Sequence, residues 1–279
     1  MSTMQEKLKK MNPRQLEAVL HTEGPLLILA GAGSGKTTVL INRIAYIIDQ
    51  SLAKPWQILA ITFTNKAAGE LKERLTAMLG DTGGDVWAAT FHSTCARILR
   101  RDGDRIGYSS HFTVYDTDDS KRLVKDCQKA LNIDDKMISH KSILSEISHA
   151  KDSMLSPADY QAAAGSDFRL AKIGAVYELY QKRLREADAM DFDDLLGNTV
   201  ELFRQCPDVL EYYQNRFRYI MVDEYQDTNQ VQYEFVRLLA GKSKNLCVVG
   251  DDDQSIYKFR GATIENIMSF EKSLSLIHI

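Results

Sequence analysis

Short apolar runs alternate with segments of helical period in the first and last thirds of the chain. The strand candidates are bounded by polar residues or glycine: Leu26–Ala30, Ile58–Thr62, Val86–Thr90, Tyr219–Asp223 and Leu246–Gly250. Between them, apolar residues recur every three or four positions, which predicts helices over Lys36–Asp49, Lys66–Leu79, His92–Arg101 and Gln230–Leu239. Apolar strands separated by helices are typical of a parallel sheet covered on both faces. The predicted fold class is therefore α/β.

The middle of the chain has a different pattern. Only His111–Tyr115 resembles a strand there, and the remaining pattern predicts helices over Asp118–Leu131, Lys141–Lys151 and Ala171–Ala187. We therefore expect a mainly helical subdomain inserted into the sheet domain. The expected boundaries are residues 1–108 for the first part of the sheet domain, 109–190 for the insertion and 191–272 for the second part.

Glycine, proline and small polar residues mark the expected turns and the end of the ordered pattern. Gly80–Asp85 is predicted to be a surface turn, and Ser156-Pro157 and Gln161–Ser166 to be loops. Thr263–Lys272 has the pattern of a helix that is cut short, and Ser273–Ile279 fits neither a helix nor the usual end of a domain. We expect a fragment of a longer protein, with residues 273–279 as a non-native tail.

A glycine-rich loop follows the first predicted strand and leads into a helix. Residues Gly31–Thr37 read Gly-Ala-Gly-Ser-Gly-Lys-Thr, and position 30 is alanine where the general pattern has glycine. Such a loop brings backbone N–H groups and a helix N-terminus to an anion. Lys36 would reach the β/γ-phosphates of a nucleoside triphosphate, and the Thr37 hydroxyl would ligate magnesium. The nucleotide-binding candidates in the loop are Ala30, Gly31, Ala32, Gly33, Ser34, Gly35, Lys36, Thr37 and Thr38.

Carboxylates at the end of a later strand supply the second half of such a site. Asp223 and Glu224 end a predicted strand, and phosphoryl chemistry needs one acid near magnesium and one that positions water. Adjacent acidic residues are common on protein surfaces. This pair is assigned to the site because the loop at Lys36 requires acidic partners. Gln254 follows another strand, where its amide would sense a γ-phosphate. Gln15 would read an adenine edge, although Asn12–Gln15 alone is also an ordinary helix start.

Composition limits the possible functions. Of the 279 residues, 44% are hydrophobic and 26% are charged, and the net charge is −3, so there is no bulk basic signal for nucleic acid. The four cysteines are scattered without metal or redox spacing, which predicts reduced thiols. No segment approaches the ~18 apolar residues of a membrane helix. We expect a cytoplasmic protein without a membrane partner.

The motifs as a set resemble the superfamily 1 DNA helicases of the UvrD, PcrA and Rep group. The matching segments follow the family's order through almost the whole chain: Asn12–Gln15, Ala30–Thr37, Thr62–Ala68, Thr90–Ser93, Asp191–Leu195, Val222–Asn229 and Val249–Ala262. The most specific is Gln254–Tyr257 followed by Phe259–Ala262. Within the group, the motifs look most like those of the PcrA members.

This resemblance implies a RecA-like motor domain with an inserted helical subdomain, which uses ATP and Mg²⁺ to move 3′ to 5′ along single-stranded DNA and to unwind duplexes at junctions. It implies that Gln15 recognises adenine and that Gln254 couples hydrolysis to DNA. It also implies that Asp223 holds magnesium and that Glu224 positions the attacking water. The implied DNA-binding residues are Phe63, Thr64, Asn65, His92, Tyr257, Phe259 and Arg260. Phe259 stands where the family often has tryptophan, but phenylalanine can still stack on a base.

The resemblance also implies partners. In this family the hydrolysis site closes against a second motor domain of the same protein, which supplies arginine fingers, so we expect slow hydrolysis and no unwinding from these residues alone. Accessory loading proteins are further possible partners.

Other interpretations remain open at this stage. The helicase–nuclease subunits of the RecB and AddA type share these motifs, and a nucleotide-gated DNA-binding or scaffold module would also retain a phosphate loop. Outside the joint pattern, Phe63 and Phe259 would more often be core residues, and His92 a helix cap.

Overall fold

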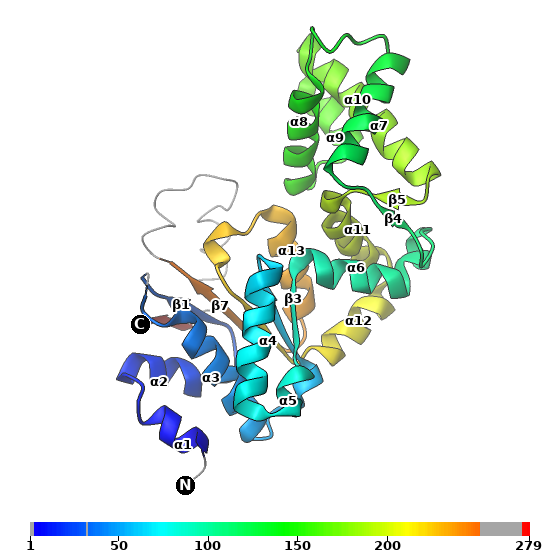
Figure 1. Cartoon of the computed structure of the whole chain (residues 1–279). Coiled ribbons are helices and arrows are strands. Elements are labelled where there is room, and N and C mark those ends of the chain that lie inside the picture. The colour runs from blue at the N-terminus through cyan, green and yellow to red at the C-terminus, as the bar shows by residue number, and fades with distance from the viewer. Residues whose placement is uncertain (1–2, 32, 252–274) are drawn as a thin grey trace. The chain divides into compact units, whose positions relative to one another are not determined.

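The computed structural model describes residues 3–31, 33–251 and 275–279 (Figure 1). The chain forms two compact units. The sheet unit comprises Met1–Ser93, Asp208–Thr228 and Val236–Ile279, and the helical unit comprises Thr94–Pro207 and Asn229–Phe235. Helices α6 (Phe91–Asp102) and α13 (Gln230–Ala240) contribute residues to both. Among the described residues, no helix is both long and apolar enough to cross a membrane.

The sheet unit is built on a parallel sheet. Its strands are β1 (Leu26–Leu29), β2 (Ile58–Thr62), β3 (Trp87–Thr90), β6 (Tyr219–Val222), β7 (Leu246–Gly250) and β8 (Ser275–His278). They are arranged in the order β3-β2-β6-β7-β1-β8, and every pairing is parallel. The five strands predicted from the sequence are confirmed within one residue at each end. All carboxyl ends therefore lie on one edge of the sheet, where parallel sheets bind ligands.

Alternating residues of these strands enter one apolar core. Leu26 and Ile28 of β1 and Cys247 and Val249 of β7 point into it, in the period of two that a strand requires. The helices α1 (Thr3–Leu8), α2 (Pro13–Leu20), α3 (Lys36–Asp49) and α4 (Asn65–Leu79) cover this face (Figure 1). The helix predicted over Lys36–Asp49 is confirmed at both ends.

The glycine pair at Gly83-Gly84 does not form a simple surface turn, so that prediction was wrong. Residues Asp81–Gly84 form a one-turn helix, α5, against α4, and Gly83 is buried. A Cβ at Gly83 would lie 2.3 Å from the carbonyl oxygen of Leu75. Glycine is therefore required here because two backbones approach closely.

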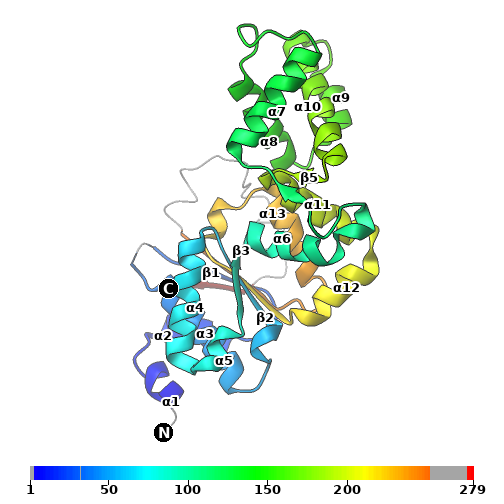
Figure 2. The ribbon, with the colours of Figure 1, turned by 45° about the vertical axis from the view of Figure 1, so that its right-hand side comes forward.

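The helical unit contains α7 (Thr117–Ala130), α8 (His140–Asp152), α9 (Pro157–Ala164), α10 (Phe168–Glu186) and α11 (Phe192–Gln205) (Figure 2). The short strands β4 (Thr113–Val114) and β5 (Ala189–Met190) pair in parallel. A separate apolar core formed mainly by α7, α8 and α10 holds the unit together. The predicted middle helices are confirmed within three residues of their ends, and β4 lies inside the predicted strand.

The loop predictions at Ser156-Pro157 and Gln161–Ser166 were wrong, because α9 begins at Pro157 and continues through Ala164. The Ser156 hydroxyl accepts a hydrogen bond from Asp159 N at 3.1 Å, and the Asp159 carboxylate accepts one from Ser156 N at 3.1 Å. This reciprocal cap, with proline at the first helical position, starts a helix rather than a loop. The helix ends at Gly165, whose φ is +54°.

The end of the chain is described only in part. Ser275–His278 form β8, which pairs with β1, although the sequence pattern assigned no element to these residues. Their expected non-native origin stays a prediction. The helix predicted over Thr263–Lys272 lies outside the described residues.

Candidate functional site

The strand order brings the predicted nucleotide residues together. Strand β1 ends at the glycine-rich loop and pairs with β7, with Leu29 opposite Gly250, and β7 pairs with β6. Asp251 directly follows β7, and Asp223 directly follows β6. The carboxyl ends of three neighbouring strands thus lead into the site: β1 into the phosphate-type loop, β7 into Asp251, and β6 into Asp223 and Glu224.

The loop has the backbone conformation that its glycines allow. Gly33 and Gly35 have φ values of +78° and +90°, in the left-handed region that a side chain disfavours. Gly35 is the N-cap of α3, so the amides of the first helical turn face the loop. The Ser34 hydroxyl is buried without a hydrogen-bond partner. A phosphate oxygen would satisfy both the free amides and this hydroxyl.

Lys36 lies between carboxylates from the two neighbouring strand ends. Its Nζ is 3.0 Å from Asp251 Oδ2 and 3.7 Å from Glu224 Oε2, and its side chain is only 12% exposed. Asp251 is 2% exposed. Asp251 is not among the site residues predicted from the sequence. The signal that the sequence offered was its position directly after the predicted strand Leu246–Gly250.

Glu224 is held in a strained backbone conformation. Its φ is +51°, in the left-handed region, which costs a non-glycine residue about 1–3 kcal/mol and is concentrated at functional sites. Gln226 Nε2 donates to Glu224 Oε2 at 2.6 Å, and Gln226 Oε1 accepts from Asp251 N at 3.2 Å. Gln226 therefore connects the two acidic segments, although it is not among the site residues predicted from the sequence.

Asp223 has a carboxyl group with a raised pKa. Burial is the main cause and the nearby charge of Glu224 adds to it, whereas a hydrogen bond from the Glu224 backbone and the charge of Lys36 partly offset both. One of its oxygens accepts a hydrogen bond from Glu224 N at 3.0 Å. A carboxylate that is incompletely compensated in this way would gain from a bound cation.

Few protein oxygen donors lie near the loop in the part of the chain that the structure describes, as expected for a magnesium ion that is also bound by a nucleotide. Thr37 and Asp223 offer one hydroxyl and one carboxylate, which are the hard oxygen donors that Mg²⁺ prefers. Within the described residues, no group of three or more His, Cys, Asp or Glu side chains is placed to hold a metal ion. Magnesium in proteins commonly has one or two carboxylate ligands and takes the others from phosphates and water. This donor set therefore suits magnesium carried by a nucleotide.

Gln15 contacts the phosphate-type loop from the start of α2. Its Nε2 donates to Ser34 O at 2.9 Å, and its Oε1 accepts from Asn12 N at 3.2 Å. Asn12 Oδ1 accepts from Gln15 N at 2.8 Å, so the predicted helix start at Asn12-Pro13 is confirmed. The amide of Gln15 thus keeps one N–H and one lone pair for a further group beside the loop.

The described DNA-binding candidates follow β2 and β3, on the same edge of the sheet. Phe63 is half-buried and packs edge-on against Phe91, with ring centroids 5.5 Å apart. The Thr64 hydroxyl caps α4 by accepting from Ala67 N at 3.1 Å, and Asn65 is exposed in the first turn. His92 is half-buried near the start of α6. At about 4.8 Å per strand, these residues lie roughly 14–19 Å across the sheet from β1.

Five of the predicted site residues lie outside the described residues. These are Ala32, Gln254, Tyr257, Phe259 and Arg260.

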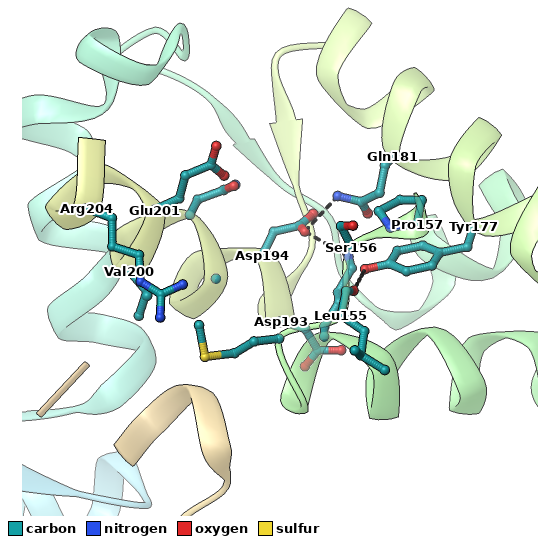
Figure 3. A pocket seen from close by; sticks show the side chains of 14 residues that line it. Leu155, Ser156, Pro157, Tyr177, Gln181, Asp193, Asp194, Val200, Glu201 and Arg204 are labelled. Carbon is teal, nitrogen blue, oxygen red and sulfur yellow. Dashed lines mark hydrogen bonds and ion pairs between the residues drawn. The ribbon is translucent and has the colours of Figure 1, made fainter. Parts of the chain in front are cut away.

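The helical unit contains a pocket of about 360 Å³ between the end of α8, the segment before α9, and helices α10 and α11 (Figure 3). Lys151 at its wall is buried, with Nζ 2.6 Å from Asp191 Oδ2 and 2.8 Å from Asp194 Oδ1. Tyr180 donates to Asp191 at 2.8 Å, and Gln181 donates to Asp194 at 3.0 Å. The predicted motif Asp191–Leu195 therefore provides the cap of α11 and a buried ion cluster.

The charges in this cluster compensate one another. Burial alone would lower the pKa of Lys151, yet the charges of Asp194 and Asp191 raise it overall. Burial would raise the pKa of Asp191, but Lys151 lowers it below its usual value. Burial raises the pKa of Asp194, and Lys151 offsets only part of this effect. The ion cluster therefore supplies no uncompensated positive charge for a phosphate.

Asp152 lies beside this cluster, at the end of α8. Asn229 Nδ2 donates to its Oδ1 at 2.6 Å. Burial and, to a smaller extent, the charge of Asp193 raise the pKa of Asp152, His149 lowers it, and the net value is about 6. Since this value exceeds the unfolded one, the folded state binds more protons between about pH 4 and pH 6, and stability should fall as the pH rises through that range.

Asp152→Asn is expected to stabilise the protein at pH 8 by about 1 kcal/mol, after discounting the pKa shift for partial exposure. The amide oxygen still accepts from Asn229, while the buried charge and its repulsion from Asp193 are removed. Urea unfolding should show this gain at pH 8 and its loss near pH 4. Exposed Asp126→Asn is the control, and an equal gain at both pH values would contradict the assignment.

Comparisons with known proteins agree with the motifs. A family model described as the UvrD/REP helicase N-terminal domain matches residues 11–275. The chain is 55% identical over 265 residues to the ATP-dependent DNA helicase PcrA of Staphylococcus aureus (strain Mu50), and 54% identical over 265 residues to that of Staphylococcus epidermidis (strain ATCC 35984). Each alignment covers 95% of this chain and 36% of the relative. The chain thus spans about a third of the length of the curated relatives it matches.

Proposed function

The chain belongs to the UvrD/REP helicase family, and on this premise we propose that it is the N-terminal motor portion of an ATP-dependent 3′–5′ single-stranded DNA translocase and helicase, acting in DNA repair or replication. The observation that carries the proposal is Lys36, held between Asp251 and Glu224 at the end of the phosphate-type loop. A triphosphate can bind here if phosphate oxygens replace these carboxylates as the partners of Lys36.

The residues have distinct roles in this proposal. Lys36 leaves its carboxylate partners and binds the β- and γ-phosphates, and the loop amides with the Ser34 hydroxyl bind the remaining oxygens. Glu224, freed from Lys36, orients the attacking water and accepts its proton. Thr37 and Asp223 would hold magnesium, which would neutralise part of the phosphate charge. Gln15 binds the edge of adenine through the side-chain N–H and the oxygen lone pair that it does not use within the protein.

Single-stranded DNA is the proposed second ligand. Phe63 and His92 supply stacking and Asn65 supplies polar contacts, at strand ends next to the nucleotide residues. Base stacking contributes about 1–3 kcal/mol per base and is indifferent to sequence, which a translocating motor requires. Gln254, Tyr257, Phe259 and Arg260 complete the proposed coupling and DNA residues.

A second motor domain of the same protein, which the family resemblance implies, is the proposed partner for hydrolysis. Arginine fingers accelerate hydrolysis by about 10³–10⁵ in related nucleotide hydrolases. We expect these 279 residues to bind ATP and single-stranded oligo(dT) but to hydrolyse ATP slower by a factor in that range than a version that includes the second domain. Steady-state ATP hydrolysis with and without oligo(dT) is the measurement.

Glu224→Gln is the control for this measurement, since it keeps the shape of the side chain but removes the base. It should abolish the residual turnover while ATP binding remains. Full DNA-stimulated turnover, or unwinding of a tailed duplex by the 279-residue chain, would contradict the proposed dependence on a second domain. ATP binding with no response of DNA affinity to nucleotide would instead favour a scaffold.

A further inference from the structure

Arg43 is a buried arginine that the proposed function does not use. It lies in α3 and is 1% exposed. Burying a guanidinium is unfavourable unless its donors are satisfied, and in the described part of the chain this one makes no ion pair. Its hydrogen bonds all go to backbone carbonyl groups: Nη1 donates to Ala18 O at 2.9 Å and to His21 O, and Nη2 donates to Thr22 O at 3.2 Å.

The three carbonyl groups belong to the end of α2 and the residues just after it. The last carbonyls of a helix have no partners within the helix, and they carry partial negative charge from the helix dipole. A cation that binds several of them therefore fixes the position of the helix end. Arg43 is a clamp of this kind, and it is carried by the helix that begins at the phosphate-type loop.

The other end of α2 contacts that loop through Gln15. Its Nε2 donates to Ser34 O at 2.9 Å, and a Cβ at Gly35 would lie only 3.2 Å from the same nitrogen. The eight residues of α2 span roughly 12 Å, and Arg43 lies about 10 Å along α3 from Lys36. Helix α2 is therefore attached at both ends to the loop and its helix, so a shift at Arg43 moves Gln15.

A second set of bonds holds the segment after α2 to the sheet. Tyr219 OH donates to Glu23 Oε1, and Asn245 Nδ2 donates to Glu23 Oε2 at 3.0 Å. Gly24 N donates to Asn245 Oδ1 at 2.8 Å. These bonds come from β6 and from the residue before β7, so they support the same placement independently of Arg43.

From this geometry we infer that Arg43 is a positioning residue for base selectivity: it holds α2 so that the Gln15 amide meets the adenine edge while the loop binds the phosphates. The inference rests on the proposed role of Gln15. It separates two parts of nucleotide binding. Affinity for the phosphates depends on Lys36 and the loop, whereas discrimination between bases depends on the position of α2 relative to Gly35.

The test measures the affinities of ATP, GTP and tripolyphosphate by competition against a fluorescent ATP analogue. Arg43→Lys keeps the charge but replaces the planar guanidinium, which donates from two nitrogens, with a single ammonium nitrogen. It should lower the ATP-to-GTP affinity ratio by roughly 3- to 10-fold, the equivalent of losing one or two hydrogen bonds, while tripolyphosphate affinity stays within about 2-fold. Tyr219→Phe, which preserves packing, should lower the ATP-to-GTP ratio by a smaller factor. This variant replaces Arg43→Lys in the test if Arg43→Lys does not fold.

Gln15→Ala distinguishes failure of the inference from failure of the proposed function. If Gln15→Ala lowers the ATP-to-GTP ratio and Arg43→Lys adds no further loss in the double variant, both act on one base contact, as inferred. If Gln15→Ala lowers the ratio but Arg43→Lys weakens ATP, GTP and tripolyphosphate equally, Arg43 has only a structural role and the inference is overturned. If Gln15→Ala leaves the ratio unchanged, the adenine role of Gln15 fails, and the inference fails with it.

Discussion

Lys36→Ala is expected to weaken ATP binding by roughly 10²- to 10⁴-fold. The reason is the loss of two charge-assisted hydrogen bonds to the β- and γ-phosphates, at about 1.5–3 kcal/mol each. Single-stranded DNA affinity should change by less than about 3-fold, because the described DNA candidates follow β2 and β3 rather than β1. Equilibrium titration with a fluorescent ATP analogue in the presence of magnesium measures the first effect, and a labelled oligo(dT) measures the second.

The same substitution also removes an ion pair from a nearly buried carboxylate. Asp251 is 2% exposed, so losing its partner at 3.0 Å should destabilise the chain without nucleotide. Lys36→Ala with Asp251→Asn should recover stability but not ATP affinity, which separates binding from folding. Lys242→Ala, at an exposed pair with Glu211, is the control and should leave both unchanged. ATP affinity within about 3-fold of the parent in Lys36→Ala would rule out the proposed phosphate role.

Lys151→Met should lower the free energy of unfolding by about 3–5 kcal/mol at pH 8, the usual loss when one partner of a buried ion pair is removed. Its Nζ lies within 2.8 Å of carboxylate oxygens from both Asp191 and Asp194, and these two side chains are at most 11% exposed. Methionine fills similar volume, so the lost energy reflects uncompensated charge rather than a cavity. Urea unfolding followed by circular dichroism gives the value.

The pH dependence of this variant distinguishes charge from packing. Without Lys151 the pKa values of Asp191 and Asp194 rise, so the folded state takes up protons and the deficit should shrink as the pH falls towards 5. Asp194→Asn in the Lys151→Met background should recover part of the stability at pH 8. Lys182→Met, at an exposed pair with Glu186 on α10, is the control. A deficit below about 1 kcal/mol at pH 8 would show that the ion cluster adds little.

Sequence patterns predicted the regular elements well where period and cap chemistry agree. The helix Lys36–Asp49 and the strands Ile58–Thr62 and Leu246–Gly250 were predicted to the residue. At Ser156-Pro157 the same residue types that make turns also start helices, and the reciprocal cap from Asp159 decides between the two. At Gly83 the deciding fact was contact with the Leu75 backbone, which local sequence does not encode.

Part of the proposed nucleotide site was also predictable from the sequence, because its chemistry is local. A phosphate cradle needs closely spaced glycines, a lysine and a hydroxyl, so Gly31–Thr37 predicts its own ligand class. The adjacent acids Asp223 and Glu224 were predicted as partners. Their side chains and Lys36 come together because β6, β7 and β1 are neighbours in the sheet.

The sequence by itself determined the parallel α/β class, the phosphate-type loop and the family, because each depends on residue types at short, regular spacing. Only the tertiary structure decided that Asp251 is the close partner of Lys36, that Gln226 joins the two acidic segments, and that Arg43 clamps α2. These contacts join residues far apart in the chain. Their energies depend on burial and on distances of about 3 Å, which strand order and packing set and which no local pattern records.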